Sequence, residues 1–516
     1  MKILTAQQMR DIDAKTVERG IPSLILMENA AYQVVEYLQR TFPKLSDQNI
    51  VVFCGKGNNG GDGLAIARRL HTYVHPRFLH VVLAADTREL RGDAAENLIM
   101  LRASPDCPVQ FDITPQMHGA TLIIDALLGT GLKGPATGKT LDFIRAINDG
   151  FPMADVVAVD VPSGMASDSG VLNGECVHAG HTVTFTAPKL CHVLAPAAER
   201  CGKLRIAPIG TPADLLEHDQ NLWLALSEPA LFRHLLLPRL ADSNKGTYGH
   251  VLTLAGARGK TGAAAMAGLA ALKMGAGLST IASAESAITA IASHAPEVMT
   301  EPLPETETGS ISSRGLDSNH LAEIVERKTV LACGPGLGSH PDTIQFVRRL
   351  VDEIEQPMVL DADALNALVR KEFNGRGVRI LTPHPGEMAR LLKRTVAEVQ
   401  ADRIGHARTF ATERSAWIVL KGASTVIAAP DGRVWINPTG SPALSTGGTG
   451  DVLTGMIAGL LAQFPNQIET CVLAGVYLHG RAGELGAAQI GELSFVATDI
   501  FRFLPEAIRE AADLSN

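Results

Sequence analysis

Residues 445–451 read Ser-Thr-Gly-Gly-Thr-Gly-Asp and lead straight into the apolar, glycine-containing segment 452–461, which is typical of a buried helix. Such a loop leaves backbone N–H groups free, and the following helix adds the positive end of its dipole, so together they form an anion site. Asp451 should lie in the first helical turn, where its carboxylate can take a proton from a hydroxyl that attacks a phosphoryl group. The alternative is a glycine-rich turn in which Asp451 only favours the helix dipole, by about 0.3–1 kcal/mol. The order of the glycines, Thr449 and Asp451 favours phosphate chemistry.

The rest of the chain must hold that loop, and its length allows two domains. At 516 residues it exceeds one usual hydrophobic core. A formal charge of −8 without a block of Lys or Arg argues against nucleic acid and against a membrane surface as partners. Seven cysteines with no C-x-x-C pair indicate reduced, mostly buried thiols rather than a zinc site. The N-terminus turns polar too early for a signal peptide, and no apolar run approaches about 18 residues, so we expect a soluble cytoplasmic protein.

The first half alternates helical patterns with short apolar runs. Thr5 and Gln8 have the spacing of a capping box, which predicts a helix opening near Ala6, and a second helix should carry residues 24–31 and end before Pro43. Continuous apolar runs between helices are typical of a parallel sheet covered on both faces. The predicted strands are 50–54, 78–83, 122–124, 156–159 and 183–185.

Glycine and aspartate gather after three of these strands, at the sheet edge where ligands bind in such folds. The loops are 55–63, which should lead into a helix at 64–70, then 125–135 and 160–164. They bring a glycine-rich anion cradle together with Asp62, Asp125 and Asp160. This combination fits a nucleotide-like ligand with a cation, and the alternative is a chance clustering of loop residues.

Two segments have some features of a phosphate-binding P-loop and fail the pattern. Residues 134–140 have three residues between the glycines where that loop needs four, and they lie well beyond the strand end. The Gly-Lys-Thr at 259–261 lacks the upstream glycine, because position 254 is Leu. Neither segment is therefore predicted to be a P-loop.

The second half follows a connecting segment at 212–244 and is not a repeat of the first. A strand at 250–254 and a small-residue helix at 262–272 come first, and the small side chains would let that helix pack close to a sheet or to substrate. Asp431-Gly432 is a hairpin signal between 426–427 and 434–436. The loops that follow the remaining strands should converge on the face that carries Asp451. These strands are 330–333, 359–360, 380–381 and 417–420.

Five single residues in these loops allow two interpretations each. His384, held between two prolines, either contacts substrate or is a structural turn residue. Lys421 either neutralises phosphate or pairs with a structural acid, and the small residues after it favour phosphate. Asp361, Asp363 and Glu387 either hold Mg²⁺ through water or cap the helices that follow them.

Taken together, these loops resemble one family, the bifunctional NAD(P)H-hydrate repair enzymes, in which an epimerase domain is fused to an ADP-dependent dehydratase domain. The resemblance covers nearly the whole chain. In the epimerase half it rests on residues 8–13, 26–31, 57–63 and 160–164. In the dehydratase half it rests on residues 245–249, 262–264, 382–387 and 447–451. It implies an α/β chain with a Rossmann-like three-layer domain at 1–218 and a ribokinase-like three-layer α/β/α domain at 222–516.

The resemblance implies that the substrate is NADH or NADPH with water added at C6 of the nicotinamide ring, written NADHX and NADPHX. The N-terminal half would interconvert its R and S forms, with Asp160 within reach as an acid or base. Substrate would be held by Asn58, Asn59, Gly60, Gly61, Asp62, Gly129, Thr130, Gly131, Leu132, Lys133, Gly134, Pro135 and Asp160. K⁺ would be bound by Asn59, Asp125 and Ser163.

The resemblance also implies that the C-terminal half phosphorylates the S-hydrate from ADP, with Mg²⁺, and then eliminates phosphate, with Asp451 as the base. Nucleotide would contact Lys421, Gly422, Ala423, Ser424, Thr425 and Gly450. Substrate would contact Ala264, Gly336, His384 and Asp451. The family suggests a homo-oligomer, a tetramer or higher. One departure is the Ser-Thr pair at 445–446, where a more basic or alanine-rich lead-in is expected.

Two other classes of function stay open from the sequence. A small-molecule kinase of the ribokinase superfamily would use the same Asp451 chemistry with ATP on a vitamin alcohol, and would leave a stable phosphorylated product. The N-terminal half could instead be a ligand-binding or scaffold module without catalysis. The presence together of Asp62, Asp125 and Asp160 counts against that module.

Overall fold

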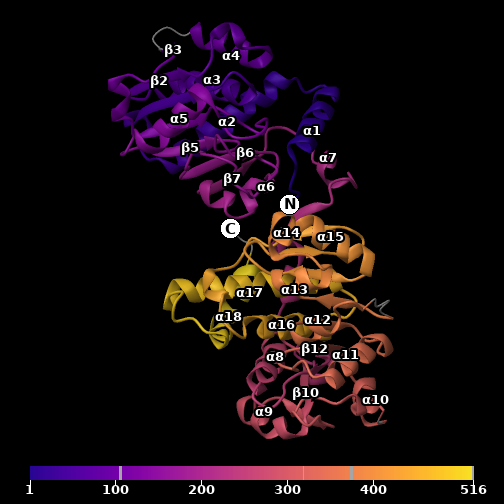
Figure 1. The fold of residues 1–516 in the computed structure, drawn as a ribbon. Coiled ribbons are helices and arrows are strands. Elements are labelled where there is room, and N and C mark those ends of the chain that lie inside the picture. The colour runs from indigo at the N-terminus through magenta and orange to yellow at the C-terminus, as the bar shows by residue number, and fades with distance from the viewer. Residues whose placement is uncertain (104–106, 108, 318, 372–375, 514–516) are drawn as a thin grey trace. The chain divides into compact units, whose positions relative to one another are not determined.

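The computed structural model describes residues 1–103, 107, 109–317, 319–371 and 376–513. The chain forms two compact units, Met1–Leu222 and Trp223–Asn516 (Figure 1). All seven cysteines are free of disulfides, as predicted. Among the described residues, no helix is both long and apolar enough to span a membrane.

Within its described residues, the first unit has a sheet of seven strands in the order β3-β2-β1-β4-β5-β6-β7, and every neighbouring pair is parallel. Its side chains alternate between two cores. Ile50, Val52 and Cys54 face one, while Val51 and Phe53 face the other. This confirms a parallel sheet covered on both faces. The strands are β1 (Asn49–Cys54), β2 (Phe78–Leu83), β3 (Val109–Gln110), β4 (Leu122–Ala126), β5 (Asp155–Val159), β6 (His181–Phe185) and β7 (Lys203–Ala207).

The helices of the first unit cover both faces of this sheet. The predicted capping box is present, because Thr5 accepts from the Gln8 backbone while Gln8 accepts from the Thr5 backbone. Leu26, Ala30 and Val34 of α2 pack into one core, and Phe143 of α5 into the other. The helices are α1 (Ala6–Glu18), α2 (Ser23–Thr41), α3 (Asn58–Arg69), α4 (Gly92–Arg102), α5 (Gly138–Asp149), α6 (Leu190–Val193) and α7 (Asp214–Glu217).

The predicted loop 55–63 is wrong in its second half, because α3 already begins at Asn58. The glycines there serve close packing. A Cβ on Gly60 would lie 1.9 Å from the Gly55 carbonyl oxygen, and one on Gly61 would lie 2.8 Å from the Met27 side chain. Glycine is a poor helix former, so the sequence reads as a loop. The packing overrides that preference.

Within its described residues, the second unit has a sheet of ten strands in the order β11-β10-β9-β12-β13-β14-β15-β16-β17-β8. The predicted hairpin is confirmed, since β16 pairs antiparallel with β15 and with β17, while the other pairs are parallel. The strands are β8 (Leu224–Leu226), β9 (His250–Leu254), β10 (Leu278–Ala284), β11 (Met299–Leu303), β12 (Val330–Cys333), β13 (Met358–Leu360), β14 (Arg379–Leu381), β15 (Trp417–Leu420), β16 (Val426–Ala428) and β17 (Val434–Ile436).

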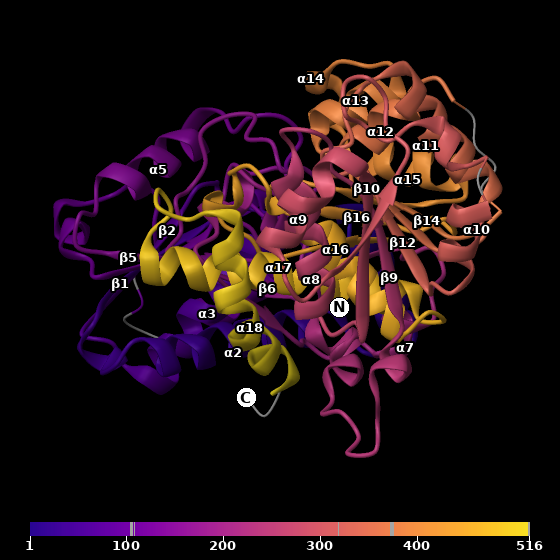
Figure 2. The same ribbon diagram turned by 90° about the horizontal axis from the view of Figure 1, so that it is seen from below.

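Helices lie on both sides of this second sheet, which confirms the three-layer α/β/α fold. Figure 2 shows helices α11 to α15 gathered on one side of the strands, with α16, α17 and α18 on the other. The helices are α8 (Thr261–Lys273), α9 (Ile288–His294), α10 (Asn319–Glu326), α11 (Pro341–Glu353), α12 (Asp363–Ala367), α13 (Pro385–Leu392), α14 (Val396–Ala401), α15 (Arg403–Arg414), α16 (Thr449–Gln463), α17 (Ile468–Ile490) and α18 (Ile500–Ala512).

The small residues of α8 allow a close backbone approach to α16, the helix that carries Asp451. A Cβ on Gly455 would lie 2.0 Å from the Ala267 carbonyl oxygen, and one on Gly459 would lie 2.5 Å from the Ala271 carbonyl oxygen. A side chain at either position would therefore push the two helices apart. This contact fixes α16 against α8.

Candidate active sites

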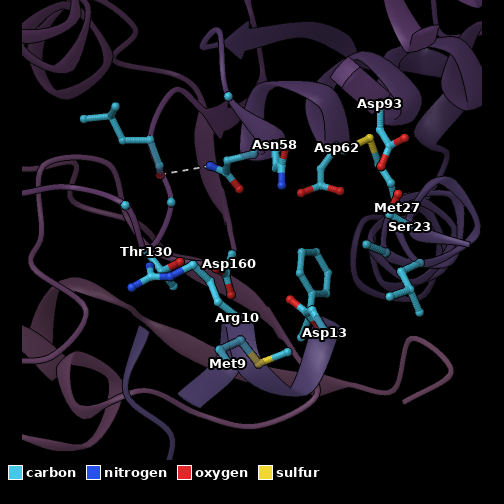
Figure 3. Close-up of a pocket in the computed structure, with 18 of the residues that line it drawn as sticks. Met9, Arg10, Asp13, Ser23, Met27, Asn58, Asp62, Asp93, Thr130 and Asp160 are labelled. Atoms are coloured by element: carbon cyan, nitrogen blue, oxygen red, sulfur yellow. Dashed lines mark hydrogen bonds between the residues drawn. The ribbon is translucent and has the colours of Figure 1, made fainter. Parts of the chain in front are cut away.

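A cavity of ≈ 580 Å³ opens in the first unit at the carboxyl ends of the strands. It lies beside β1 and β4, where the strand order reverses and a parallel sheet leaves a crevice. Residues 56–59, after β1, and 127–133, after β4, line it together with parts of α1 and α2. Figure 3 shows the acidic side chains of this cavity from several elements facing one open space.

Nine of the predicted substrate residues line the cavity. They are Asn58, Asn59, Asp62, Gly129, Thr130, Gly131, Leu132, Lys133 and Asp160. Gly60, Gly61, Gly134 and Pro135 are not part of its described lining. Gly60 and Gly61 are buried inside α3, as described above. Pro135 lies close to Gly174, because a Cβ placed on Gly174 would be 2.9 Å from the Pro135 side chain.

Asp160 is paired with a buried lysine that the sequence reasoning missed. The Lys189 ammonium, in a side chain only 1% exposed, donates to Asp160 Oδ1 at 2.6 Å and to Thr184 Oγ1 at 2.8 Å. Thr184 Oγ1 in turn lies 2.9 Å from Asp160 Oδ1. Burial by itself would raise the pKa of Asp160, but the Lys189 charge and these hydrogen bonds hold it below its ordinary value. Asp160 is therefore an ionised carboxylate at neutral pH.

The backbone at Asp160 is also unusual, with a φ of 63°. This left-handed conformation is uncommon for a residue with a Cβ, although aspartate tolerates it better than most. It turns the chain sharply directly after β5, and the Asp160 N–H donates to the Val183 carbonyl at 2.8 Å. Local strain of this kind is held by surrounding structure, and here it directs the carboxylate toward Lys189 and the cavity.

Asp13 and Asp62 face the same cavity in a different electrostatic setting. Burial raises the pKa of Asp13 to about 6, an increase that Lys189 opposes and Asp160 reinforces. Burial raises the pKa of Asp62 well above its ordinary value, and the charges of Asp160, Asp13 and Asp93 add to that shift. The cavity thus holds one ionised carboxylate beside acids that keep a proton more readily.

Asn59, which lines the cavity, and the fully buried Asp125 and Ser163 are linked through Leu127 and Leu128. Asp125 accepts from Ser163 Oγ at 2.6 Å and from the Ser163 N–H at 2.8 Å, and Asn59 Nδ2 donates to the Leu128 carbonyl at 2.9 Å. Asn59 Oδ1 is buried, and no described residue satisfies it. Burial raises the pKa of Asp125 to about 6, and the bonds from Ser163 and Leu127 oppose this shift. The unsatisfied buried oxygen of Asn59, a residue that shares the Leu128 carbonyl with the Ser163 hydroxyl, fits the predicted monovalent cation.

In the second unit, the loop before α16 has the predicted form. Gly448, with φ 95°, is the N-cap, no side chain caps the helix, and Asp451 lies in the first turn. Thr449 Oγ1 donates to the Leu444 carbonyl at 2.9 Å and to the Thr446 carbonyl at 3.1 Å. The Thr449 carbonyl in turn lies 2.9 Å from Nε2 of the buried His479 in α17. These bonds hold the loop in shape from both sides.

The loops after β13 and β15 meet this helix. Asp361, fully buried after β13, accepts from Lys421 Nζ at 2.7 Å and from Thr454 Oγ1 of α16 at 3.0 Å. A Cβ on Gly450 would lie 3.2 Å from Lys421 Nζ and 3.4 Å from Asp361 Oδ2, so these groups lie directly against the anion loop. Burial would lower the pKa of Lys421, but Asp361, Glu387 and Asp451 hold it above its ordinary value. Lys421 therefore pairs with a structural acid and also faces the loop.

Asp451 is poised as a base near neutral pH. Burial raises its pKa to about 7, Asp361, Asp363 and Glu387 add to the increase, and Lys421 opposes it. A carboxylate with a pKa near the working pH is suited to general base catalysis.

The three acids after β13 and β14 have structural partners. Glu387 completes a capping box with His384, whose backbone N–H donates to Glu387 Oε2 at 2.8 Å, while His384 Nδ1 accepts from the Gly386 N–H at 3.0 Å. Asp363 accepts from the Gly338 N–H at 2.8 Å and pairs with Lys260. His384 thus has a structural role, and its half-exposed ring also leaves it open to solvent.

The predicted nucleotide segment, Lys421 to Thr425, is held by a residue that the sequence reasoning missed. Arg403 of α15 donates to the carbonyls of Leu420, Lys421 and Ala423, and burial lowers its pKa to about 10. A Cβ on Gly422 would lie 2.9 Å from the Arg403 guanidinium. Arg403 therefore holds this turn in shape through its hydrogen bonds to the three backbone carbonyls.

Of the predicted substrate residues, Ala264 lies near the start of α8, and Gly336, in the loop after β12, packs against that start. A Cβ on Gly336, with φ 64°, would lie 2.8 Å from the Lys260 carbonyl oxygen. Ala264 is fully buried, and its Cβ would lie 3.0 Å from one placed on Gly256. The buried Ala264 methyl group therefore packs beside Gly256.

Comparison with known proteins finds matches across both units. A family model described as YjeF-related protein N-terminus matches residues 23–191, and one described as NAD(P)H-hydrate dehydratase matches residues 251–506. The bifunctional NAD(P)H-hydrate repair enzyme Nnr of Moorella thermoacetica is 43% identical, covering 99% of this chain and 97% of its own length. The protein of the same name from Escherichia coli is 33% identical, covering 95% of this chain and 90% of its own length.

Solved structures match parts of the chain. A crystal structure of ADP/ATP-dependent NAD(P)H-hydrate dehydratase from Bacillus subtilis is 35% identical and covers 56% of this chain and 98% of its own, with a TM-score of 0.48. A yeast protein is 22% identical and covers 42% of this chain and 93% of its own, with a TM-score of 0.36.

Proposed function

This chain belongs to the bifunctional NAD(P)H-hydrate repair enzymes, and from that premise we propose how its residues divide the repair of a damaged nicotinamide cofactor. Residues 1–218 interconvert the R and S forms of NADHX and NADPHX. Residues 222–516 dehydrate the S form to NADH or NADPH while ADP is converted to AMP and phosphate. The observation that supports the dehydratase proposal is that Asp451, whose pKa is raised to about 7, lies in the first helical turn directly after the anion loop.

In the dehydratase half, Asp451 takes the proton of the C6 hydroxyl as that oxygen attacks the terminal phosphoryl group of ADP. The N–H groups at the start of α16 and the Lys421 ammonium face the negative charge that develops, because Gly450 lies against Lys421. Phosphate then leaves from C6, and loss of the C5 proton restores the ring double bond. The turn from Lys421 to Thr425, with Gly450, contacts the nucleotide, while Ala264, Gly336 and His384 lie toward the substrate.

Four carboxylates surround this site, namely Asp361, Asp363, Glu387 and Asp451, against the ammonium groups of Lys421 and Lys260. Within the described residues, no group of three or more His, Cys, Asp or Glu side chains is placed to hold a metal directly. These carboxylates would therefore hold Mg²⁺ through water. Mg²⁺ would supply positive charge to the phosphate oxygens.

In the epimerase half, the cavity residues hold the hydrate and the ionised Asp160 faces its ring. Asn59, Asp125 and Ser163 would hold K⁺, as the unsatisfied Asn59 oxygen supports. K⁺ would supply a fixed positive charge behind the loop formed by residues 129–135, which would order that loop around the substrate. We also propose that the chain works in the cytoplasm and that it forms a homo-oligomer, a tetramer or higher. Light scattering of the purified protein tests the oligomeric state.

The decisive experiment incubates purified full-length protein with mixed R and S hydrates of NADH and follows recovery of dihydronicotinamide absorbance with ADP or ATP. Wild type with ADP should convert both epimers. Asp451→Asn should convert neither, and Asp160→Ala should convert only the S form quickly. Release of inorganic phosphate is measured in parallel, because a kinase would leave a stable phosphorylated product. No recovery with either nucleotide would refute the repair function.

A further inference from the structure

Asp13 differs from the other carboxyl groups of the epimerase cavity in its contacts. It is presented by α1, outside the glycine-rich loops, and it lines the cavity with Asp62 and Asp160. Its Oδ1 is buried, and no described residue donates to it. Figure 3 shows the Asp13 carboxylate pointing toward the same open space as Asp160. A buried carboxyl oxygen without a hydrogen-bond partner among the described residues, at the wall of the cavity, can take a partner from the substrate.

Asp160 is badly placed to carry a proton. Its Oδ1 is engaged by both Lys189 and Thr184, which favour the ionised form. Protonation of Asp160 would leave the Lys189 ammonium buried without its counter-charge, which is unfavourable in a site of low dielectric. A fixed carboxylate is better suited to stabilise positive charge nearby than to give up a proton.

We propose that Asp13 is the proton-carrying catalytic residue of the epimerase half, and that Asp160 is the fixed counter-charge beside it. This inference rests on the epimerase function proposed above. The groups around Asp13 support the division of roles, because burial raises the pKa of Asp13 to about 6 while Lys189 keeps it from rising further. Burial raises the pKa of Asp62 well above its ordinary value, and the neighbouring acids add to that shift, so Asp62 releases a proton less readily than an ordinary carboxyl group.

The proton follows a closed cycle. Protonated Asp13 donates to the C6 hydroxyl, the C6–O bond breaks, water leaves, and the ring-nitrogen lone pair forms a C=N bond. The resulting cation lies beside the Asp160 carboxylate. Water then adds to the opposite face of C6, the C=N electrons return to nitrogen, the added water releases its proton to solvent, and Asp13 takes up a proton from solvent. The cycle consumes no oxidant, reductant or cofactor, and it inverts the configuration at C6.

The test follows R-to-S conversion by chromatography in full-length protein without nucleotide, so that the dehydratase half is silent. Asp13→Asn should lower kcat by about 100-fold or more, as removal of a general acid does, while KM changes little. Asp13→Glu should keep part of the activity because it retains the carboxyl. The matched control is Asp11→Asn, an exposed residue of the same helix, which should behave as wild type.

A pH profile separates a catalytic role from a structural one. In wild type, kcat should fall as pH rises above about 6, as Asp13 loses its proton, and this limb should be absent from the residual activity of Asp13→Asn. Other charged groups line the same cavity or lie beside it, and the fit of the profile includes each of them. These are Arg10, Lys56, Asp62, Asp93, Lys133, Asp160, Lys189 and His192.

Dehydration of S-hydrate with ADP, measured on the same samples, shows that the second unit is intact, and calorimetry shows whether the first unit is folded. An Asp13→Asn variant that is folded and keeps kcat within about tenfold of wild type refutes the role of Asp13. If that variant does not fold, a wild-type profile without the alkaline limb refutes it instead. Wild type that fails to interconvert the epimers at all would refute the proposed function rather than this residue.

Discussion

Replacing Lys189 by methionine should destabilise the first unit and leave the second unit unchanged. The ammonium is buried and bonds to Asp160, Thr184 and the Phe185 carbonyl, so its loss leaves an unpaired carboxylate in a side chain only 15% exposed. Removing one partner of a buried ion pair costs about 3–5 kcal/mol. For a unit of this size that is a fall in Tm of about 6–20 °C.

The cost should depend on pH in a defined direction. In wild type the pKa of Asp160 is depressed, so its stabilising effect is present above the unfolded pKa of about 3.9 and is lost as pH falls through the folded value. In Lys189→Met, only the Thr184 hydrogen bond and His192 still oppose burial, which is the largest effect, so the pKa of Asp160 should rise above its ordinary value. The variant then gains stability as pH falls through that raised pKa. The difference in Tm should therefore be largest at neutral pH and shrink toward about pH 5.

The assay can separate the two units within one chain. All three tryptophans, Trp223, Trp417 and Trp435, belong to the second unit, so tryptophan fluorescence follows that unit, while calorimetry follows both. Only the calorimetric transition of the first unit should move. The double variant Lys189→Met/Asp160→Asn removes both charges and should recover most of the loss. Lys203→Met, at an exposed position of the same unit, is the matched control. An unchanged first transition, or no recovery in the double variant, would contradict this account of Asp160.

Three further predictions concern the dehydratase half and the cation. Burial raises the pKa of Asp451 to about 7, and the base must be ionised, so kcat for dehydration should fall as pH drops below about 7. Because Glu387 also raises this pKa, Glu387→Gln should shift the fall in kcat to lower pH. An unshifted profile would mean that Glu387 does not act on Asp451. Gly455→Ala places a Cβ 2.0 Å from the Ala267 carbonyl oxygen and should lower the Tm reported by tryptophan fluorescence. The control Gly447→Ala has open space around its Cβ and should leave that Tm unchanged. Equal Tm values for the two variants would contradict the close approach of α8 and α16. Asn59→Ala should weaken the stimulation of epimerisation by K⁺ over Na⁺ while dehydration of S-hydrate is unchanged, and equal stimulation in wild type and variant would argue against a cation at Asn59.

Local sequence patterns predicted the features that depend on neighbouring residues along the chain. The run after Gly448 had to be helical and buried, so Asp451 could be placed in its first turn. Apolar runs located β1, β2 and β4 because buried parallel strands leave little choice of side chain. The rule that ligands bind at the carboxyl ends of parallel strands then brought Asp62 and Asp160 to one cavity.

Features that depend on contacts between distant segments could not be predicted in the same way. In the sequence, Lys189 is a single lysine after a strand, and no local pattern marks it as a functional residue. Only the pairing of β5 with β6 brings it to Asp160. The start of α3 at Asn58 depends on how Gly60 packs against Gly55, which overrides a weak helix propensity. The strand β10 was missed because its small side chains, in Leu278–Ala284, carry little apolar signal.

The backbone contact between α8 and α16 has a consequence for reading sequence variation in proteins of this kind. At Gly455 and Gly459 any side chain would meet the carbonyl oxygens of the facing helix, although neither glycine takes part in the chemistry. A saturation library selected for dehydratase activity would therefore reject almost every substitution at these two positions, as it would at Asp451. Intolerance to substitution along α16 would then mark two different requirements, a base at its first turn and closeness to α8 further on. Only a stability measurement on each rejected variant would distinguish them.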